Sequence, residues 1–233
     1  MRAKILIILI YIGYGVYGQD SLAVEPIKLR TQIFSLSPIS KKVSVVNGIV
    51  LGVGHFDNKN IKTQIINGVN LEASPLCLWA PMLPFIAWGN RGDNCHFAEN
   101  YEGSRLVKVS GINISLGGFT TRAQMNGINI STLTQMEILN GISLSVFAID
   151  CKKTKGISIA GFYNYNREIN GISVGIVNNT AFLEGIQLGL LNTCTTRMEG
   201  VQIGLLNMSG KTKGLQIGLL NINKKRALPF INF

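Results

Sequence analysis

The feature that most constrains this chain is a short phrase that recurs at a nearly fixed spacing. Its clearest copies are GIQLGLLN, GVQIGLLN and GLQIGLLN, which begin at Gly185, Gly200 and Gly214. The opening glycine returns every 14 to 16 residues from Gly111 onward, and divergent copies begin at Gly48 and Gly68. A period this short predicts a repeat architecture, in which each unit buries its apolar side against its neighbours.

Each unit alternates as a β-strand does. After Gly185, the apolar residues Ile186, Leu188 and Leu190 occupy every second position, which is the period of a strand. The residue two after the opening glycine is polar in eight successive units from Gly111 onward, and the residue two before it is usually apolar. The chain between phrases is mostly polar. The sequence therefore predicts an all-β fold built from one strand and one turn per unit.

A parallel β-solenoid fits this pattern, with each unit of 14–15 residues forming one coil. The glycines at positions one and five and the asparagine at position eight of each phrase are then corner residues with positive φ. These structural repeat positions are Gly185, Gly189, Asn192, Gly200, Gly204, Asn207, Gly214, Gly218 and Asn221. Identical positions of successive coils should stack about 4.8 Å apart, which is the strand spacing of a sheet.

An up-and-down β-barrel is the alternative. The stretch 198–207 is long enough for one outer-membrane strand, and the chain ends in Phe233 as such barrels often do. However, the apolar residues Val201, Ile203 and Leu205 span only roughly 13 Å of a lipid-facing band about 25 Å tall. The barrel also gives no reason for two fixed glycines in every strand. The pattern therefore favours the solenoid.

The three clear phrases and the ending KKRALPFINF resemble a family of secreted bacterial surface-repeat proteins with tandem G-L-Q-I-G-L-x-N units. The similarity is strongest over 171–233 and weakens toward residue 41, where VNGIVLGVGHFDN is similar to the first unit of that family. The resemblance implies a signal peptide and a place in the cell envelope. It implies no reaction.

The N-terminus is typical of a signal peptide. Arg2 and Lys4 precede an apolar run that ends in small residues, and the run is too short to favour a membrane-spanning helix. We therefore expect residues 1–18 to be a signal peptide, 19–40 a lead-in and 41–233 a single β-repeat domain. The expected location is the periplasm, the outer membrane or the cell surface.

An irregular apolar insertion at about 73–106 interrupts the repeat. Its sequence SPLCLWAPMLPFIAWGN holds three prolines, which exclude a long regular helix or a central strand. The insertion either covers an end or a side of the repeat stack, or it contacts a membrane or a partner. In the second case the interaction residues would be Trp79, Phe85 and Trp88.

Four cysteines, Cys77, Cys95, Cys151 and Cys194, permit one or two disulfides in an exported chain. All three connectivities stay open if all four pair. Cys77 and Cys95 are the first pair to test, because both lie in the insertion.

No catalytic, cofactor or metal motif is present in the sequence. His55 and His96 are the only histidines, and neither belongs to an acidic cluster. The 22 lysines and arginines exceed the 12 aspartates and glutamates, but they are scattered and not interleaved with aromatic residues as in a nucleic-acid site. We predict a protein that is not an enzyme, has no cofactor and binds no nucleic acid.

The pattern leads to two functional hypotheses. The first is a structural or adhesive protein of the cell envelope that offers a flat polar ladder, such as Gln187, Gln202 and Gln216, to an envelope or extracellular ligand. Contact with a membrane stays open in this hypothesis. The alternative is an outer-membrane β-barrel that forms a small pore.

Overall fold

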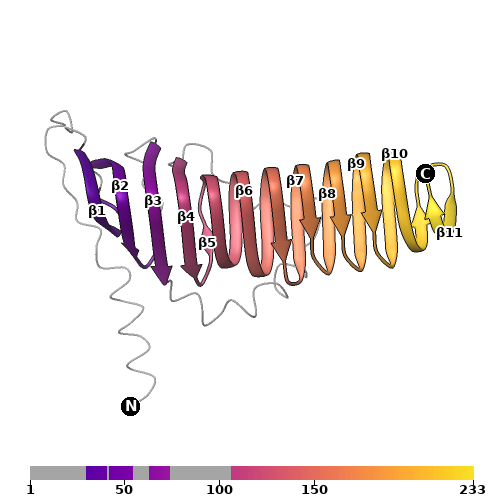
Figure 1. The fold of residues 1–233 in the computed structure, drawn as a ribbon, viewed down its shortest axis with the longest axis horizontal. Coiled ribbons are helices and arrows are strands. Elements are labelled where there is room, and N and C mark those ends of the chain that lie inside the picture. The colour runs from indigo at the N-terminus through magenta and orange to yellow at the C-terminus, as the bar shows by residue number, and fades with distance from the viewer. Residues whose placement is uncertain (1–29, 41, 55–62, 74–105) are drawn as a thin grey trace, which may run out of the picture.

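The chain folds as a stack of parallel β-coils, seen side-on in Figure 1. This architecture comes from a computed structural model, which describes residues 30–40, 42–54, 63–73 and 106–233. The stack has about ten turns with about 15 residues between parallel bridges. The predicted β-solenoid is therefore confirmed.

The strands follow one another along the stack axis in chain order, with β5 beside β6. They are β1 (Arg30–Ser37), β2 (Val43–Gly52), β3 (Thr63–Ala73), β4 (Leu106–Leu116), β5 (Phe119–Thr120), β6 (Ala123–Ala160), β7 (Tyr163–Val174), β8 (Val177–Leu188), β9 (Leu191–Ile203), β10 (Leu206–Ile222) and β11 (Ala227–Asn232). The long strand β6 passes continuously through more than one coil.

Successive strands pair in parallel with equivalent residues side by side. Gly200 lies opposite both Gly185 and Gly214, and the divergent copies follow the same register, with Gly68 between Gly48 and Gly111. An up-and-down barrel needs antiparallel neighbours, so that alternative architecture is wrong. The in-register pairing follows from the repeat, because each coil presents the same residues to the next.

The two ends of the sheet differ from its middle. At the C-terminal end, β11 runs antiparallel to β10 and covers its edge. The Nδ2 of Asn232 donates to the Oε1 of Gln216 at 3.2 Å, so the end strand also continues an interior side-chain ladder. At the other end, β1 lies within the predicted lead-in and pairs with β2, so the sheet begins before residue 41.

The opening glycine of each coil is required for two reasons. In the ten coils its φ lies between +132° and +152°, a region that side chains rarely adopt. From Gly68 to Gly214, an added Cβ would also lie only 1.9–2.1 Å from the carbonyl oxygen of the preceding opening glycine. The coils thus approach one another most closely at a column of glycines, which fixes their register.

The other predicted corner residues act differently. Gly189, Gly204 and Gly218 do not have positive φ, nor do Asn192, Asn207 and Asn221, so that part of the corner prediction is wrong. The three glycines are required by space instead. An added Cβ would lie 2.0–2.1 Å from the glycine carbonyl of the preceding coil and 2.5–2.6 Å from an asparagine Nδ2.

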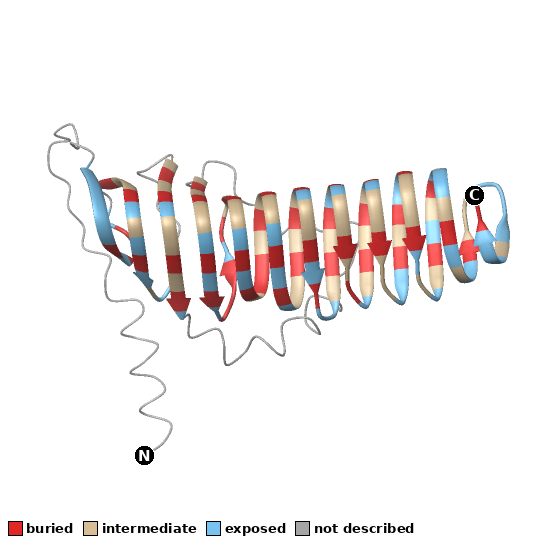
Figure 2. Cartoon of the chain, in the orientation of Figure 1, coloured by how far each residue is buried: buried red, intermediate tan, exposed pale blue. Residues whose placement is uncertain are grey.

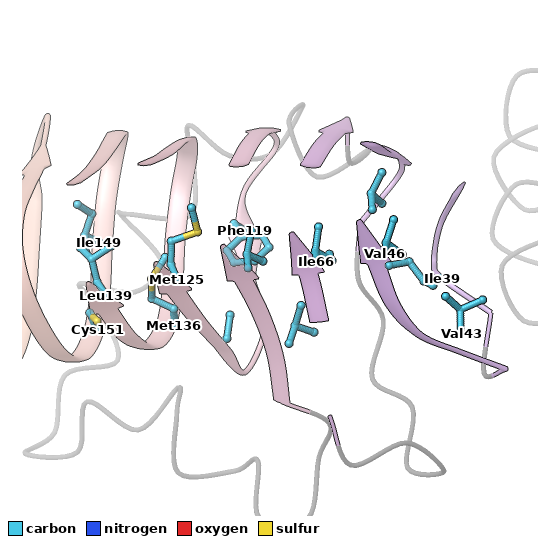
Figure 3. Close-up of a cluster of buried hydrophobic side chains, with 14 of the residues drawn as sticks. Ile39, Val43, Val46, Ile66, Phe119, Met125, Met136, Leu139, Ile149 and Cys151 are labelled. Atoms are coloured by element: carbon cyan, nitrogen blue, oxygen red, sulfur yellow. The ribbon is translucent and has the colours of Figure 1, made fainter. Parts of the chain in front are cut away.

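The apolar core lies inside the coils and is largest in the first half of the stack. Figure 3 shows side chains of successive coils lined up along it. The column two residues before the opening glycines includes the fully buried Val46, Ile66, Val109, Met125 and Leu139. In the second half the apolar cluster shrinks to Ile169, Leu183, Cys194 and Met198. Polar side chains fill the remaining interior.

Replacing one opening glycine should destabilise the stack. We expect Gly200→Ala to lower the free energy of unfolding by at least about 3 kcal/mol, because it adds strain at φ +147° and a contact of 1.9 Å with the oxygen of Gly185. Gly54→Ala is the control, since φ is +123° there but nothing lies within 4 Å of the added Cβ. Denaturant unfolding of both variants should show a clearly larger loss for Gly200→Ala. Equal losses would contradict the role of the close approach.

Candidate interaction surface

The interior of the coils is largely polar, and much of the outside is aliphatic. Gln187, Gln202 and Gln216 are fully buried, so the prediction that this ladder faces a ligand is wrong. Figure 2 shows buried and exposed segments alternating along each coil. Within one strand, the buried Gln202 lies between Val201 and Ile203, which is 41% exposed.

Buried glutamines are stable here because each bonds its equivalent in the next coil. The Nε2 of Gln202 donates to the Oε1 of Gln187 at 2.7 Å, and the Nε2 of Gln216 donates to the Oε1 of Gln202 at 2.8 Å. A buried amide without a partner destabilises a fold by about 1–3 kcal/mol. The in-register stack lowers that cost, because Gln202 both donates to one neighbour and accepts from the other. At the start of the ladder, where the preceding coil has Ser173, the Nε2 of Gln187 has no partner.

The asparagines of position eight form a second interior ladder, as the repeat predicts. Asn178 donates to Asn192, Asn192 to Asn207 and Asn207 to Asn221, with Nδ2–Oδ1 distances of 2.8, 2.8 and 2.7 Å. Each Nδ2 also donates to a backbone carbonyl, such as that of Ile217 at 2.9 Å for Asn207. A third ladder joins Asn70, Asn113 and Asn129 in the first half of the stack.

We define the apolar face as the residues one and three after the opening glycine in the ten described coils. They are Ile49, Leu51, Val69, Leu71, Ile112, Ile114, Ile128, Ile130, Ile142, Leu144, Ile157, Ile159, Ile172, Val174, Ile186, Leu188, Val201, Ile203, Leu215 and Ile217. Every one is valine, leucine or isoleucine, and each is half-buried or exposed. The residue between each pair is buried, so both members of the pair point outward.

A corner ladder extends the apolar face. The ladder consists of one residue from each of five successive coils, namely Phe147, Phe162, Ile176, Leu190 and Leu205. The backbone N–H groups of Phe162, Leu190 and Leu205 each donate to the carbonyl of the ladder residue in the preceding coil. The first two rings stack, with their centroids 6.1 Å apart. The face is about 48 Å long and about 10 Å wide, and it widens to about 17 Å over the five coils of this ladder, so the strip covers roughly 650 Å². The largest apolar patch on a typical soluble monomer is about 300–600 Å².

Charged side chains lie on the other part of each coil. In the described coils, the only charged residue within five positions after an opening glycine is Glu72, which is buried. Ion pairs join residues that precede the glycines, such as Lys213 with Glu199 at 3.2 Å and Lys153 with Glu168 at 3.0 Å. The hydrogen bond from Lys213 lowers the pKa of Glu199, with a smaller effect of the positive charge of Arg197. The outer surface is therefore amphipathic.

An open groove of about 420 Å³ lies on the charged side. It is lined by Lys153, Thr154, Lys155, Glu168, Ile169, Asn170, Phe182, Leu183, Glu184 and Arg197. Its charges are of both signs, and Lys153 is paired with Glu168 within the lining. The groove therefore has no concentrated charge for an ionic ligand.

The alternation of each strand held a signal that the sequence analysis missed. The residues two before and two after an opening glycine are four apart, so they share one side of a strand. The first is usually apolar and interior, as Met198 is. The second, such as Gln202, must then also be interior, and Val201 and Ile203 must face outward.

The two cysteines in the described part of the chain do not pair with each other. Cys151 and Cys194 are free and buried, in coils that are three repeats apart. That separation exceeds the Cα–Cα distance of about 7 Å that a disulfide can bridge. The pairing of Cys77 with Cys95 stays a prediction, because both lie outside the described residues.

The other predicted site residues also lie outside the described part of the chain. These are the interaction residues Trp79, Phe85 and Trp88 and the histidines His55 and His96. Within the described ranges, no three His, Cys, Asp or Glu side chains come together as a metal site would. The same ranges contain no helix long and apolar enough to cross a membrane.

Comparisons of the chain with protein-family models, with curated proteins and with solved structures gave no match. The predicted membership of the surface-repeat family therefore stays a prediction.

Cutting the asparagine ladder should destabilise the protein. We expect Asn207→Ala to cost about 2 kcal/mol or more, because the carbonyl of Ile217 and the amides of Asn192 and Asn221 each lose a buried partner. Asn170→Ala is the matched control, since this asparagine donates to Glu184 in an exposed bond and should cost under about 1 kcal/mol. Thermal and denaturant unfolding compare the two, and equal losses would refute the ladder's contribution.

The two interior thiols should be unreactive in the folded protein. Burial raises the pKa of Cys151 and of Cys194 to about 11, so roughly one thiol in a thousand is ionised at pH 8. In a Cys77→Ser/Cys95→Ser variant, we expect no reaction with Ellman's reagent at pH 8 until denaturant is added, and then two thiols. Rapid labelling of the folded variant would show that the interior is open to solvent.

Proposed function

We propose that this chain is a non-enzymatic protein of the cell envelope that attaches to its target through the apolar face. The single observation that carries the proposal is the inverted pattern of the coils, with amides inside and aliphatic side chains outside. Exposed aliphatic surface of this extent is unfavourable in water by about 25 cal/mol per Å². A surface of this kind is typical of a binding site.

Export and attachment fit together in this proposal. The signal-peptide pattern of residues 1–18 and the resemblance to secreted surface-repeat proteins both favour the envelope. A structural or adhesive role follows from a long, uniform face with no charged side chain on it. We do not propose the small pore, because it depends on a closed antiparallel barrel.

Fractionation of the producing cells tests the proposal. Ile130, Leu144 and Ile159 occupy the same outward position in three successive coils and are 41%, 37% and 37% exposed. The threonine variant changes all three to Thr, and the valine variant changes all three to Val. Both replacements are β-branched, which favours the strand in each case.

We expect the wild-type protein and the valine variant to stay in the envelope fraction through a high-salt wash and to be released by detergent. The threonine variant should appear largely in the salt wash, because its apolar contact is reduced while its charges are unchanged. Thermal unfolding of all three proteins checks that each is folded. Identical fractionation of the two variants would refute attachment through the apolar face.

A further inference from the structure

We propose that the target of the apolar face is the surface of a lipid bilayer that contains anionic headgroups. This inference rests on the proposed function, in which the apolar face is the attachment surface. The protein would lie flat, with its stack axis in the plane of the membrane and the aliphatic side chains at the boundary between headgroups and acyl chains. Amphipathic helices bind membranes with the same division of apolar and charged sides.

The division of chemistry around the coil supports this orientation. Outward positions one and three after the opening glycine are aliphatic in all ten described coils, and the ion pairs lie on residues that precede the glycines. Most interior amide atoms are bonded within the stack, and those without a partner, such as the Nε2 of Gln187, belong to buried side chains inside the coil, so a coil needs no polar partner on its aliphatic side. That side can enter an apolar phase without stranding a backbone or amide group, since the strands are paired to their neighbours.

The uniformity of the face favours a fluid target over a rigid one. A protein partner that slid along the stack by one coil would meet nearly the same side chains, so nothing would fix its position. Acyl chains have no register to satisfy. A second copy of this chain would be such a rigid partner, and it would carry the same net positive charge.

The net positive charge of the chain favours anionic lipids, since its 22 lysines and arginines exceed its 12 aspartates and glutamates. At the rim of the face, the residue immediately before an opening glycine is basic in Lys155 and Lys213 and acidic in Glu184 and Glu199, and Lys213 is paired with Glu199. The preference for anionic headgroups therefore comes from the charge of the whole chain, while a long side chain such as that of Lys155 can reach headgroup depth with its stem near the apolar face.

Vesicle co-sedimentation tests the inference with the exported mature chain, whose N-terminus is determined by mass spectrometry. The vesicles are phosphatidylcholine alone and phosphatidylcholine mixed with phosphatidylglycerol. We expect the wild type to bind both, to bind the mixed vesicles more tightly, and to lose that preference in high salt. The threonine variant should bind at least about tenfold more weakly, and the valine variant within about twofold of the wild type.

Residues outside the described ranges are the same in all three proteins, so the difference between the variants reports the apolar face alone. Equal vesicle binding by the two variants overturns the inference, as does an absence of binding by the wild type. Sedimentation velocity without lipid gives the remaining outcome, in which a dimer that is broken by the threonine substitutions and ignores vesicles identifies a second copy as the target. In that case attachment in cells would still depend on the face, so the proposed function would stand while the lipid inference fails.

Discussion

The contact between glycine backbones of neighbouring coils is the constraint on which the rest of the structure depends. From Gly68 to Gly214, each opening glycine lies so close to the preceding one that a methyl group would overlap its carbonyl oxygen. Sliding a coil along its neighbour would bring a side chain into that space. The register is therefore fixed once per coil, and every other position of the repeat is aligned with its equivalents as a consequence.

Alignment of equivalent positions makes a polar interior stable. A lone buried glutamine would destabilise the fold, but the Oε1 of Gln202 accepts a hydrogen bond from Gln216 and its Nε2 donates one to Gln187. The interior also stays filled along the stack, because a shorter side chain at one position of a coil is compensated by longer side chains at other positions. Where the residue two after the glycine shrinks to Ser158, the longer Asn164 and Asn166 reach across to bond it.

An interior filled by amides leaves the aliphatic residues of the same strands on the outside. This arrangement reverses the usual strand of a water-soluble protein, in which apolar side chains face the core. The reversal is confined to the part of the coil that follows the glycine. The part that precedes it has the ordinary pattern, with Met198 inside and the ion pair of Glu199 with Lys213 outside. The amphipathic cross-section thus comes from two halves of a coil with opposite patterns.

The sequence by itself determined the β-class, the coil length and the stacking of asparagines, because a repeat of 14–16 residues aligns identical side chains whenever neighbours pair in parallel. It did not determine the inner and outer sides of a strand, since alternation is symmetric and Val201-Gln202-Ile203 can be read either way. Only the tertiary structure decided that the glutamine is interior, because its hydrogen-bond partners come from other coils. The same applies to the glycines of position five. Only a glycine fits there because a carbonyl oxygen and an asparagine side chain of neighbouring coils lie too close for a Cβ, and the sequence does not show which residues come that close.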